Sequence, residues 1–228
     1  MKGKMKIHKS TLNMLKNFSD INMSIDVKAG NLLRTVSVQK NILAEAEVET
    51  TFPQDFAIYE VNRFLGAVSL FEDPDFEFGE KSVKIGNDKY SLDYVYCDPS
   101  MIVTPPEKNI TVPDPEVSFK LTQDTLSQLL KAGNVLGTPE IVVEGGSQPN
   151  DVIRLRAMDV NNDSSDTFHV NLTETSNATF RFVFKIENFK MVSTEDFDVE
   201  ISSKGIARFS KNQLQYWIAT ESSSTYGG

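Results

Sequence analysis

Apolar residues recur at helical spacing in four short segments of the chain. The first, residues 10–18, opens with Ser10 as an N-cap and repeats its apolar residues every three or four positions. The same spacing predicts short helices at 60–70, 122–132 and 186–191. Each segment also has a polar side that carries Lys or Arg. The pattern therefore predicts four short amphipathic helices, two in each half of the chain.

Between the helices, apolar and polar residues alternate with a period of two, which is typical of strands with one buried face. The clearest such runs are residues 89–96, 152–157, 167–173, 180–184 and 213–219. Short stretches rich in Gly, Asn, Asp and Ser separate several of them, and this composition favours turns. Short strands and short helices in this mixture indicate an α+β fold.

The two halves of the chain resemble each other. Between them, residues 104–115 (TPPEKNITVPDP) hold four prolines and predict an extended connector. FAIYEVNRF at 56–64 aligns with RFVFKIENF at 181–189, on the other side of the connector. YSLDYVY at 90–96 then aligns with NQLQYWI at 212–218 in the same order. The alignment predicts an internal duplication, and thus two similar domains.

Length and composition agree with that organisation. The chain has 228 residues, of which 39% are hydrophobic and 24% are charged, which suits two folded domains. We place an N-terminal domain at 1–103, a connector at 104–117 and a C-terminal domain at 118–228. No stretch is as long and apolar as a secretory signal or a membrane-spanning helix requires, so we expect a cytoplasmic protein without membrane contact.

The residues on which most enzymes and metal sites depend are scarce. Cys97 is the only cysteine, which excludes an intramolecular disulfide, and His8 and His169 are the only histidines. No nucleotide-binding loop or nucleophile motif is present, and the stretch 159–166 and its continuation lack the Gly and Glu of a calcium loop. We interpret the acidic loop at 72–80 as a solvated face, with a cation site as the alternative. The sequence thus predicts no catalytic residue, no metal and no cofactor.

Charge is distributed unevenly along the chain. The formal net charge is −9, which by itself argues against binding to nucleic acid. Residues 1–19, however, contain five lysines and no acidic residue, whereas residues 72–80 contain five acidic residues and no basic one. This asymmetry indicates that one surface meets an anion while the remainder stays acidic. The alternative is that the terminal lysines only solvate the chain end.

Several runs, in this order, resemble one family. They are MKIHKSTLNMLKNF at 5–18, EVNRFLGAVSL at 60–70, the proline-rich connector and QYWIATESSST at 215–225. Together they resemble the sliding clamps of T-even-type bacteriophages, which are processivity factors of the replicative DNA polymerase. The resemblance implies two similar α+β processivity-clamp domains per chain and a head-to-tail homotrimer around duplex DNA. Helices would line this ring, and antiparallel sheets would form its outer wall.

A ring retains DNA by enclosing it, so a few cations facing the backbone suffice and no base readout is expected. Our DNA-facing candidates are the cations on the polar sides of the four predicted helices: Lys9, Lys16, Arg63, Lys131 and Lys190, with Lys4 and Lys6 in support. The alternative for each residue is that it only solvates its helix. Subunits of the family join through edge strands, which here would be about 89–97 and 167–173.

The resemblance also implies partners. The replicative polymerase would supply a short peptide with a hydrophobic end, docked in a pocket that we assign to Ile110, Val112, Pro113, Tyr216 and Trp217. For Tyr216 and Trp217 an ordinary core position is the alternative. A separate ATP-driven clamp loader would open the ring in the cytoplasm of an infected bacterial host, and the family is also linked to late transcription. Two other functions stay open: a trimeric virion or scaffold protein without DNA encirclement, and an enzyme that uses carboxylates alone.

Overall fold

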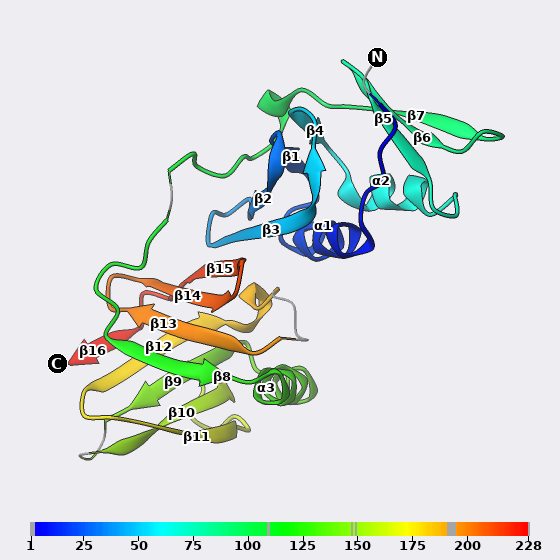
Figure 1. Ribbon diagram of the computed structural model, residues 1–228. Coiled ribbons are helices and arrows are strands. Elements are labelled where there is room, and N and C mark those ends of the chain that lie inside the picture. The colour runs from blue at the N-terminus through cyan, green and yellow to red at the C-terminus, as the bar shows by residue number, and fades with distance from the viewer. Residues whose placement is uncertain (1–2, 109, 147, 149, 191–194, 228) are drawn as a thin grey trace. The chain divides into compact units, whose positions relative to one another are not determined.

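The chain folds into two compact units, which are described separately. A computed structural model describes residues 3–108, 110–146, 148, 150–190 and 195–227 (Figure 1). The first unit spans Met1–Lys108 and the second Asn109–Gly228. The division between them falls inside the proline-rich segment that the sequence predicts as a connector.

The first unit contains two helices and seven strands among the described residues. In chain order the elements are α1 (Lys9–Ile21), β1 (Ile25–Val27), β2 (Gly30–Val36), β3 (Ile42–Phe52), β4 (Phe56–Ile58), α2 (Val61–Val68), β5 (Asp75–Phe78), β6 (Ser82–Gly86), β7 (Ser91–Val95) and the 3-10 turn η1 (Pro99–Met101). Strand β1 pairs with β4, β2 with β3, and β5, β6 and β7 form a meander; every pair is antiparallel.

The second unit contains one α-helix and nine strands among the described residues. The elements are β8 (Val117–Leu121), α3 (Gln123–Leu136), β9 (Glu140–Gly145), β10 (Asp151–Met158), β11 (Phe168–Ser176), β12 (Thr179–Lys185), the 3-10 turn η2 (Ile186–Asn188), β13 (Phe197–Ser202), β14 (Ile206–Lys211), β15 (Leu214–Ala219) and β16 (Thr225–Gly227). One antiparallel sheet has the order β11-β10-β9-β12-β16, and β8, β13, β14 and β15 follow one another in a second.

The two units repeat one order of elements. In each unit a strand or bridge precedes a helix, and four strands, a second helical segment and a three-strand meander follow (Figure 1). The 3-10 turn η1 then ends the first series, and strand β16 ends the second. Even the first pairing is repeated: Met5 bridges to Phe76 in β5, as β8 pairs with β13. The two aligned sequence pairs fall on β4 and β12, and on β7 and β15. The predicted pair of similar α+β domains is therefore confirmed.

The long helices form because each has a cap and one apolar face. In α1 the buried residues include Leu15 and Phe18, which lie three positions apart. The helix begins one residue earlier than predicted, since the His8 side chain, rather than that of Ser10, accepts the capping hydrogen bond. In α3, Thr122 caps the first turn and Gly137 ends the helix in the left-handed region, at φ 67°.

The predicted fourth helix is wrong in extent. Of the segment 186–191, only the single 3-10 turn η2 is helical among the described residues, and Met191 lies outside them. The chain leaves η2 at Phe189, which is buried, with its ring centroid 5.8 Å from that of Phe184 and 5.7 Å from that of Phe209. Packing of this ring into the core takes the place of a further helical turn.

All five predicted strands are present, as β7, β10, β11, β12 and β15, but further strands were missed. Strand β9 has no alternation to detect, because nearly all of its residues are buried. Strand β5 lies within the segment predicted as an acidic loop, so that prediction is wrong for Asp75–Phe78. There Phe76 and Phe78 are buried in alternation with acidic residues, a period-two signal that was present in the sequence.

Candidate nucleic-acid interface

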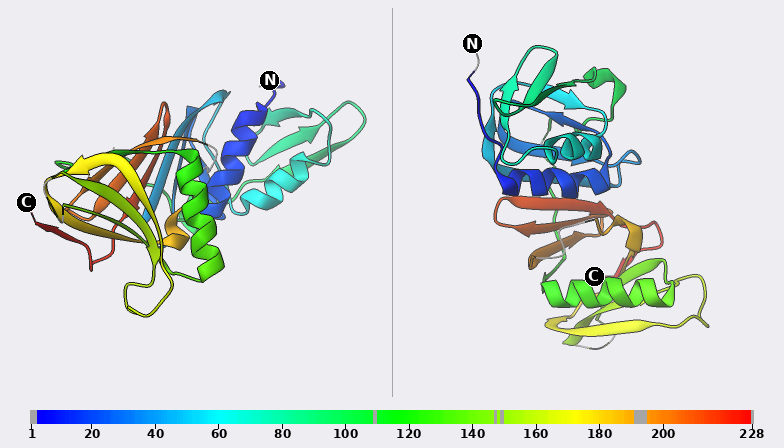
Figure 2. Two further views of the ribbon diagram at one scale, coloured as in Figure 1. Left: turned by 90° about the horizontal axis from the view of Figure 1, so that it is seen from below. Right: turned by 90° about the vertical axis from the view of Figure 1, so that its right-hand side faces the viewer.

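In the first unit, α1 and α2 lie side by side and present cations on their exposed sides (Figures 1 and 2). The apolar face of α1 is buried, so Lys9 and Lys16, seven positions apart, lie on the exposed side. Arg63 on α2 is exposed beside the buried Phe64. A groove of about 500 Å³ is lined by residues of α1 and of the end of α2, with Lys9 and Lys16 among them.

The Lys16 side chain on α1 forms a hydrogen bond with a residue of α2. Its Nζ atom donates a hydrogen bond of 2.8 Å to Oδ1 of Asn62 on α2. The Ser19 hydroxyl, one turn further along α1, lies 3.0 Å from the same oxygen atom. The nearest carboxylate partner of Lys16 is Asp20, at 3.9 Å. The ammonium therefore has a fixed neutral partner and only a distant acidic one.

Arg63, Lys9 and Lys131 have no close carboxylate partner among the described residues. Nη1 of Arg63 lies 3.7 Å from the Glu60 carboxylate in a weak, exposed pair on one helix face. In the part of the chain that the structure describes, Lys9 and Lys131 have no carboxylate within ion-pair distance, and Lys131 is exposed on α3. Lys190 is also exposed, two residues beyond η2. In the second unit these two segments touch, because α3 passes Ile186 of η2 closely at Gly133.

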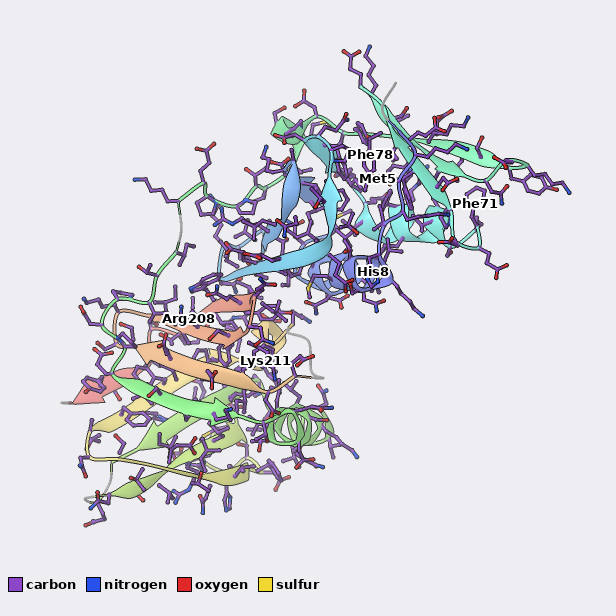
Figure 3. All side chains as sticks on the ribbon, viewed as in Figure 1. Met5, His8, Phe71, Phe78, Arg208 and Lys211 are labelled. Atoms are coloured by element: carbon purple, nitrogen blue, oxygen red, sulfur yellow. The ribbon has the colours of Figure 1, made fainter. Side chains whose placement is uncertain are left out.

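Lys4 and Lys6, by contrast, are paired with acidic residues of their own unit. The segment around Met5 runs along β5 (Figure 3) with backbone hydrogen bonds of 3.0 and 2.8 Å to Phe76. Lys6 lies 3.1 Å from Asp75 and 3.0 Å from Asp73, and hydrogen bonding to Asp73 raises the pKa of its ammonium. Lys4 lies 3.8 Å from Asp75. The basic and acidic segments of the sequence therefore partly neutralise each other, which places Lys4 and Lys6 apart from the helix cations.

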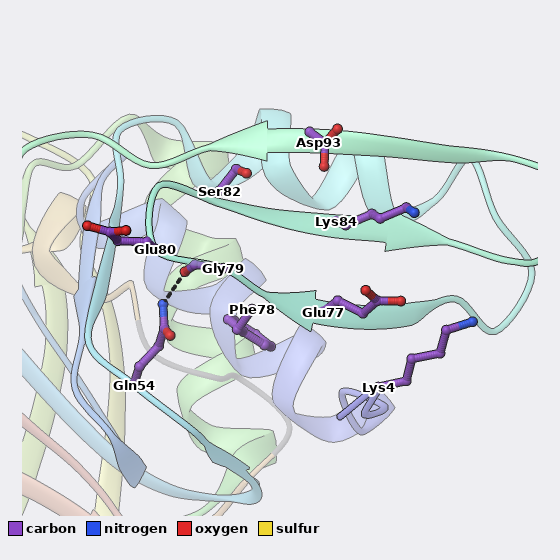
Figure 4. Close-up of a pocket in the computed structure, with 9 residues that line it drawn as sticks. All are labelled: Lys4, Gln54, Glu77, Phe78, Gly79, Glu80, Ser82, Lys84 and Asp93. Atoms are coloured by element: carbon purple, nitrogen blue, oxygen red, sulfur yellow. Dashed lines mark hydrogen bonds between the residues drawn. The ribbon is translucent and has the colours of Figure 1, made fainter. Parts of the chain in front are cut away.

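The meander β5-β6-β7 carries a mixed rather than an acidic surface. A groove of about 830 Å³ lies on it, and Glu77, Lys84 and Asp93 stand in one row across its three strands (Figure 4). Gln54 closes one end by donating a hydrogen bond of 2.6 Å to the carbonyl of Gly79. Within the residues that the structure describes, no group of three or more His, Cys, Asp or Glu side chains could hold a metal ion.

His8, Ser10 and Glu49 meet, but not in the geometry of a hydrolytic relay. The Ser10 hydroxyl lies 2.7 Å from His8 Nδ1 and 2.9 Å from Glu49, and the same Nδ1 lies 3.1 Å from Glu49. A relay needs the nucleophile and the orienting acid on opposite ring nitrogens. Both partners here share one nitrogen, so the cluster serves to cap α1.

Burial raises the pKa of the Cys97 thiol, which keeps it protonated and weakly nucleophilic.

The residues assigned to a partner-peptide pocket separate into two groups. Ile110, Val112 and Pro113 are partly exposed on the connector segment. Tyr216 is 0% exposed, with its ring centroid 5.9 Å from that of Phe197, and Trp217 is 5% exposed. Both lie at buried positions of β15, so they offer no surface to a peptide in this conformation.

Among the strands that end a sheet in the described part of the chain are β7 in the first unit and β11 in the second. Strand β7 pairs only with β6, and β11 pairs only with β10. Along both strands exposed and half-buried residues alternate, so that Leu92 and Tyr94 on β7, and Val170 and Leu172 on β11, are only half covered. Such edges are templates for pairing with another chain.

No helix in the described part of the chain is long and apolar enough to cross a membrane.

Comparisons with known proteins match both units. The model of the family "DNA polymerase processivity factor" matches residues 6–103, and that of "gp45 sliding clamp, C terminal" matches residues 118–222. The sliding clamp of Vibrio phage KVP40 is 36% identical over 95% of this chain and 99% of its own length. That of Enterobacteria phage T4 is 30% identical over 97% of this chain and 99% of its own length.

Among solved structures, the fold is similar to PCNA of A. fulgidus, solved with the C-terminal region of FEN-1 bound. The TM-score is 0.69 at 11% sequence identity, over 94% of this chain and 96% of that one. At this identity the likeness shows the fold alone.

Proposed function

The chain belongs to the sliding-clamp family of T4-like phages, the processivity factors of DNA polymerase, and from that premise we propose that three copies close into a ring around duplex DNA. The ring tethers the replicative polymerase at the primer end, and the chain itself catalyses no reaction. The observation that carries the proposal is the placement of exposed cations along the helical segments of a protein whose formal net charge is −9.

Enclosure explains how an acidic protein keeps hold of a polyanion. Lys9, Lys16, Arg63, Lys131 and Lys190 face the channel in this proposal. Since neutralised phosphates supply affinity without sequence information, a few exposed cations contact any backbone and release it again as the ring slides. The paired Lys4 and Lys6 contribute less, because carboxylates already occupy their ammonium groups.

The edge strands supply a way to close the ring. Strand β7 of one subunit pairs with β11 of the next, a heterologous contact that closes after three copies. This pairing covers the half-buried residues Leu92, Tyr94, Val170 and Leu172. It also covers the free edges of β7 and β11, which otherwise invite uncontrolled strand addition.

Partner binding would take place on the connector. In the similarly folded PCNA of A. fulgidus, the C-terminal region of FEN-1 is bound. Here a polymerase peptide with a hydrophobic end would contact Ile110, Val112 and Pro113, since Tyr216 and Trp217 are buried. Tethering raises the effective concentration of polymerase at the primer end, so rebinding outruns escape. The other proposed partners are a separate clamp-loader ATPase and late-transcription factors. The protein would meet them in the cytoplasm of the infected bacterial host.

A retention experiment tests the ring. The protein is loaded onto nicked circular DNA by the phage clamp loader with ATP, and retention is measured by gel filtration before and after a restriction cut. We expect retention on the circle and release once the DNA is linear. Equal retention on both forms, or on neither, would refute encirclement and would favour a trimeric virion or scaffold protein.

A further inference from the structure

The Lys16–Asn62 bridge has the chemistry of a phosphate-binding unit. We propose that Lys16 and Asn62 act together and donate hydrogen bonds to a single backbone phosphate of duplex DNA. This inference rests on the proposed function and deepens it, because it assigns a DNA-contacting role to a neutral residue on α2.

The orientation of the Asn62 amide follows from its partners. An ammonium group can only donate hydrogen bonds, so the atom that lies 2.8 Å from Lys16 Nζ must be the amide oxygen. The Ser19 hydroxyl, at 3.0 Å, approaches the same oxygen. The Lys16 ammonium therefore fixes Oδ1 as the acceptor, and the Nδ2 group with its two protons lies on the other side of the amide. Within the described residues, Nδ2 has no hydrogen-bond partner.

The bridge is anchored on one side and open on the other. Ser19 is only 8% exposed, and its hydroxyl also lies 2.6 Å from the carbonyl oxygen of Lys16. Asn62 is exposed, and the side chain of Lys16 is 59% exposed. The single proton of this buried hydroxyl lies between the Lys16 carbonyl and the Asn62 oxygen, and the Lys16 ammonium supplies the shorter hydrogen bond to the amide. The ammonium group and the amide NH₂ group are both on exposed residues.

That pair of donors suits a phosphodiester. Its two non-bridging oxygen atoms accept several hydrogen bonds at once, and its single charge matches the single charge of Lys16. The neutral amide adds directional hydrogen bonding without adding a second cation. An interaction of this kind orients the backbone yet releases it readily, as sliding requires.

Substitutions at the two positions test the unit. The assay is the DNA concentration that gives half-maximal loading of the full chain by clamp loader and ATP, measured at several salt concentrations. We expect N62A to raise this concentration by about fivefold, the effect expected for removal of one net hydrogen bond. N62D should be worse than N62A, since a carboxylate would also neutralise Lys16. The K16A/N62A double variant should resemble K16A, because both residues serve one phosphate.

Two controls distinguish a structural effect of the substitutions from weaker binding to phosphate. N31A removes an exposed asparagine on β2 that has no hydrogen-bond partner among the described residues, and it should load like the wild type. K16A should lower the slope of log affinity against log salt by about 0.9 for each phosphate that is no longer neutralised, whereas N62A should change the slope less. If Asn62 has only a structural role, N62A should alter the melting temperature or the trimer mass, and the salt slopes of K16A and N62A should not differ.

The outcomes distinguish the two levels of proposal. If K16A loads poorly and N62A loads like the wild type, or if the two effects multiply in the double variant, the joint action of the two residues is overturned while the clamp survives. If K16A also loads like the wild type at every salt concentration, Lys16 does not face DNA and the channel assignment itself is wrong at this helix.

Discussion

Reversing the charge of three helix lysines should damage DNA loading without damaging the protein. The variant is K9E/K16E/K131E. Lys9 and Lys131 have no carboxylate within ion-pair distance among the described residues, and the acidic partner of Lys16 is 3.9 Å away. The substitutions therefore break no close ion pair, although K16E also removes the exposed hydrogen bond from Lys16 to Asn62. Each surface change of this kind alters stability by about 0.5 kcal/mol.

The size of the effect follows from the number of phosphates that the three lysines neutralise. Each reversal changes the charge by two, so three of them take the formal net charge of a subunit from −9 to −15. Each neutralised phosphate contributes about −0.9 to the slope of log affinity against log salt, so removing three of these interactions lowers the slope by about 2.7. Between 50 and 200 mM salt, that slope corresponds to a factor of about 40 in affinity for each subunit.

The assay compares two variants of equal net charge. The control is K40E/K81E/K108E, which reverses three exposed lysines that have no ion pair among the described residues and lie outside the helices. Both variants are loaded onto nicked circular DNA by the clamp loader at 50 and 200 mM salt, and trimer mass is measured by light scattering. We expect unchanged mass for both, weak loading and low processivity for the helix variant, and near-normal loading for the control.

One result would refute this reasoning. If loading falls equally in the two variants, the effect comes from overall repulsion between an acidic protein and DNA, and the helix cations have no special place. Normal processivity of the helix variant would contradict the channel assignment outright, even though membership of the sliding-clamp family would stand.

Four further predictions concern stability, assembly and partner binding. F18A empties a site that is 1% exposed on α1, and urea unfolding should show a loss of about 3–5 kcal/mol. D55A removes the 2.8 Å hydrogen bond that the Ala29 amide donates to the Asp55 carboxylate. That hydrogen bond and Lys28 lower the pKa of the Asp55 carboxyl, so its stabilising effect is present above the ordinary pKa of 3.8 and is lost as the pH falls through the lowered pKa. The unfolding free energies of the wild type and of D55A should therefore converge in acid. L172D puts a charge on the half-buried side of the β11 edge and should reduce the light-scattering mass from trimer to monomer while the circular dichroism spectrum is kept. V112D should abolish polymerase stimulation but leave loading intact, and failure of both activities would argue against a connector site.

Local pattern carried much of the architecture. Periodicity located three helices and five strands, because one buried face imposes its spacing on the sequence wherever an element is half covered. The duplication was visible for the same reason: equivalent core positions in β4 and β12, and in β7 and β15, call for similar apolar residues. Strands such as β9, buried on both faces, gave no such signal. The runs that resemble phage sliding clamps sufficed for the family.

Tertiary structure decided which charged and aromatic side chains are available. Lys6 and Lys16 look alike in the sequence, yet β5 brings two carboxylates to Lys6, whereas α2 brings a neutral amide to Lys16. The partners lie 67 and 46 positions away along the chain, in Asp73 and Asn62. For Tyr216 the sequence left a peptide pocket and a core position open, and the packing of β15 decides for the core. Periodicity reports which face of an element is covered, but only the folded chain sets which distant group lies opposite each side chain, and that group determines whether a lysine stays available to meet DNA.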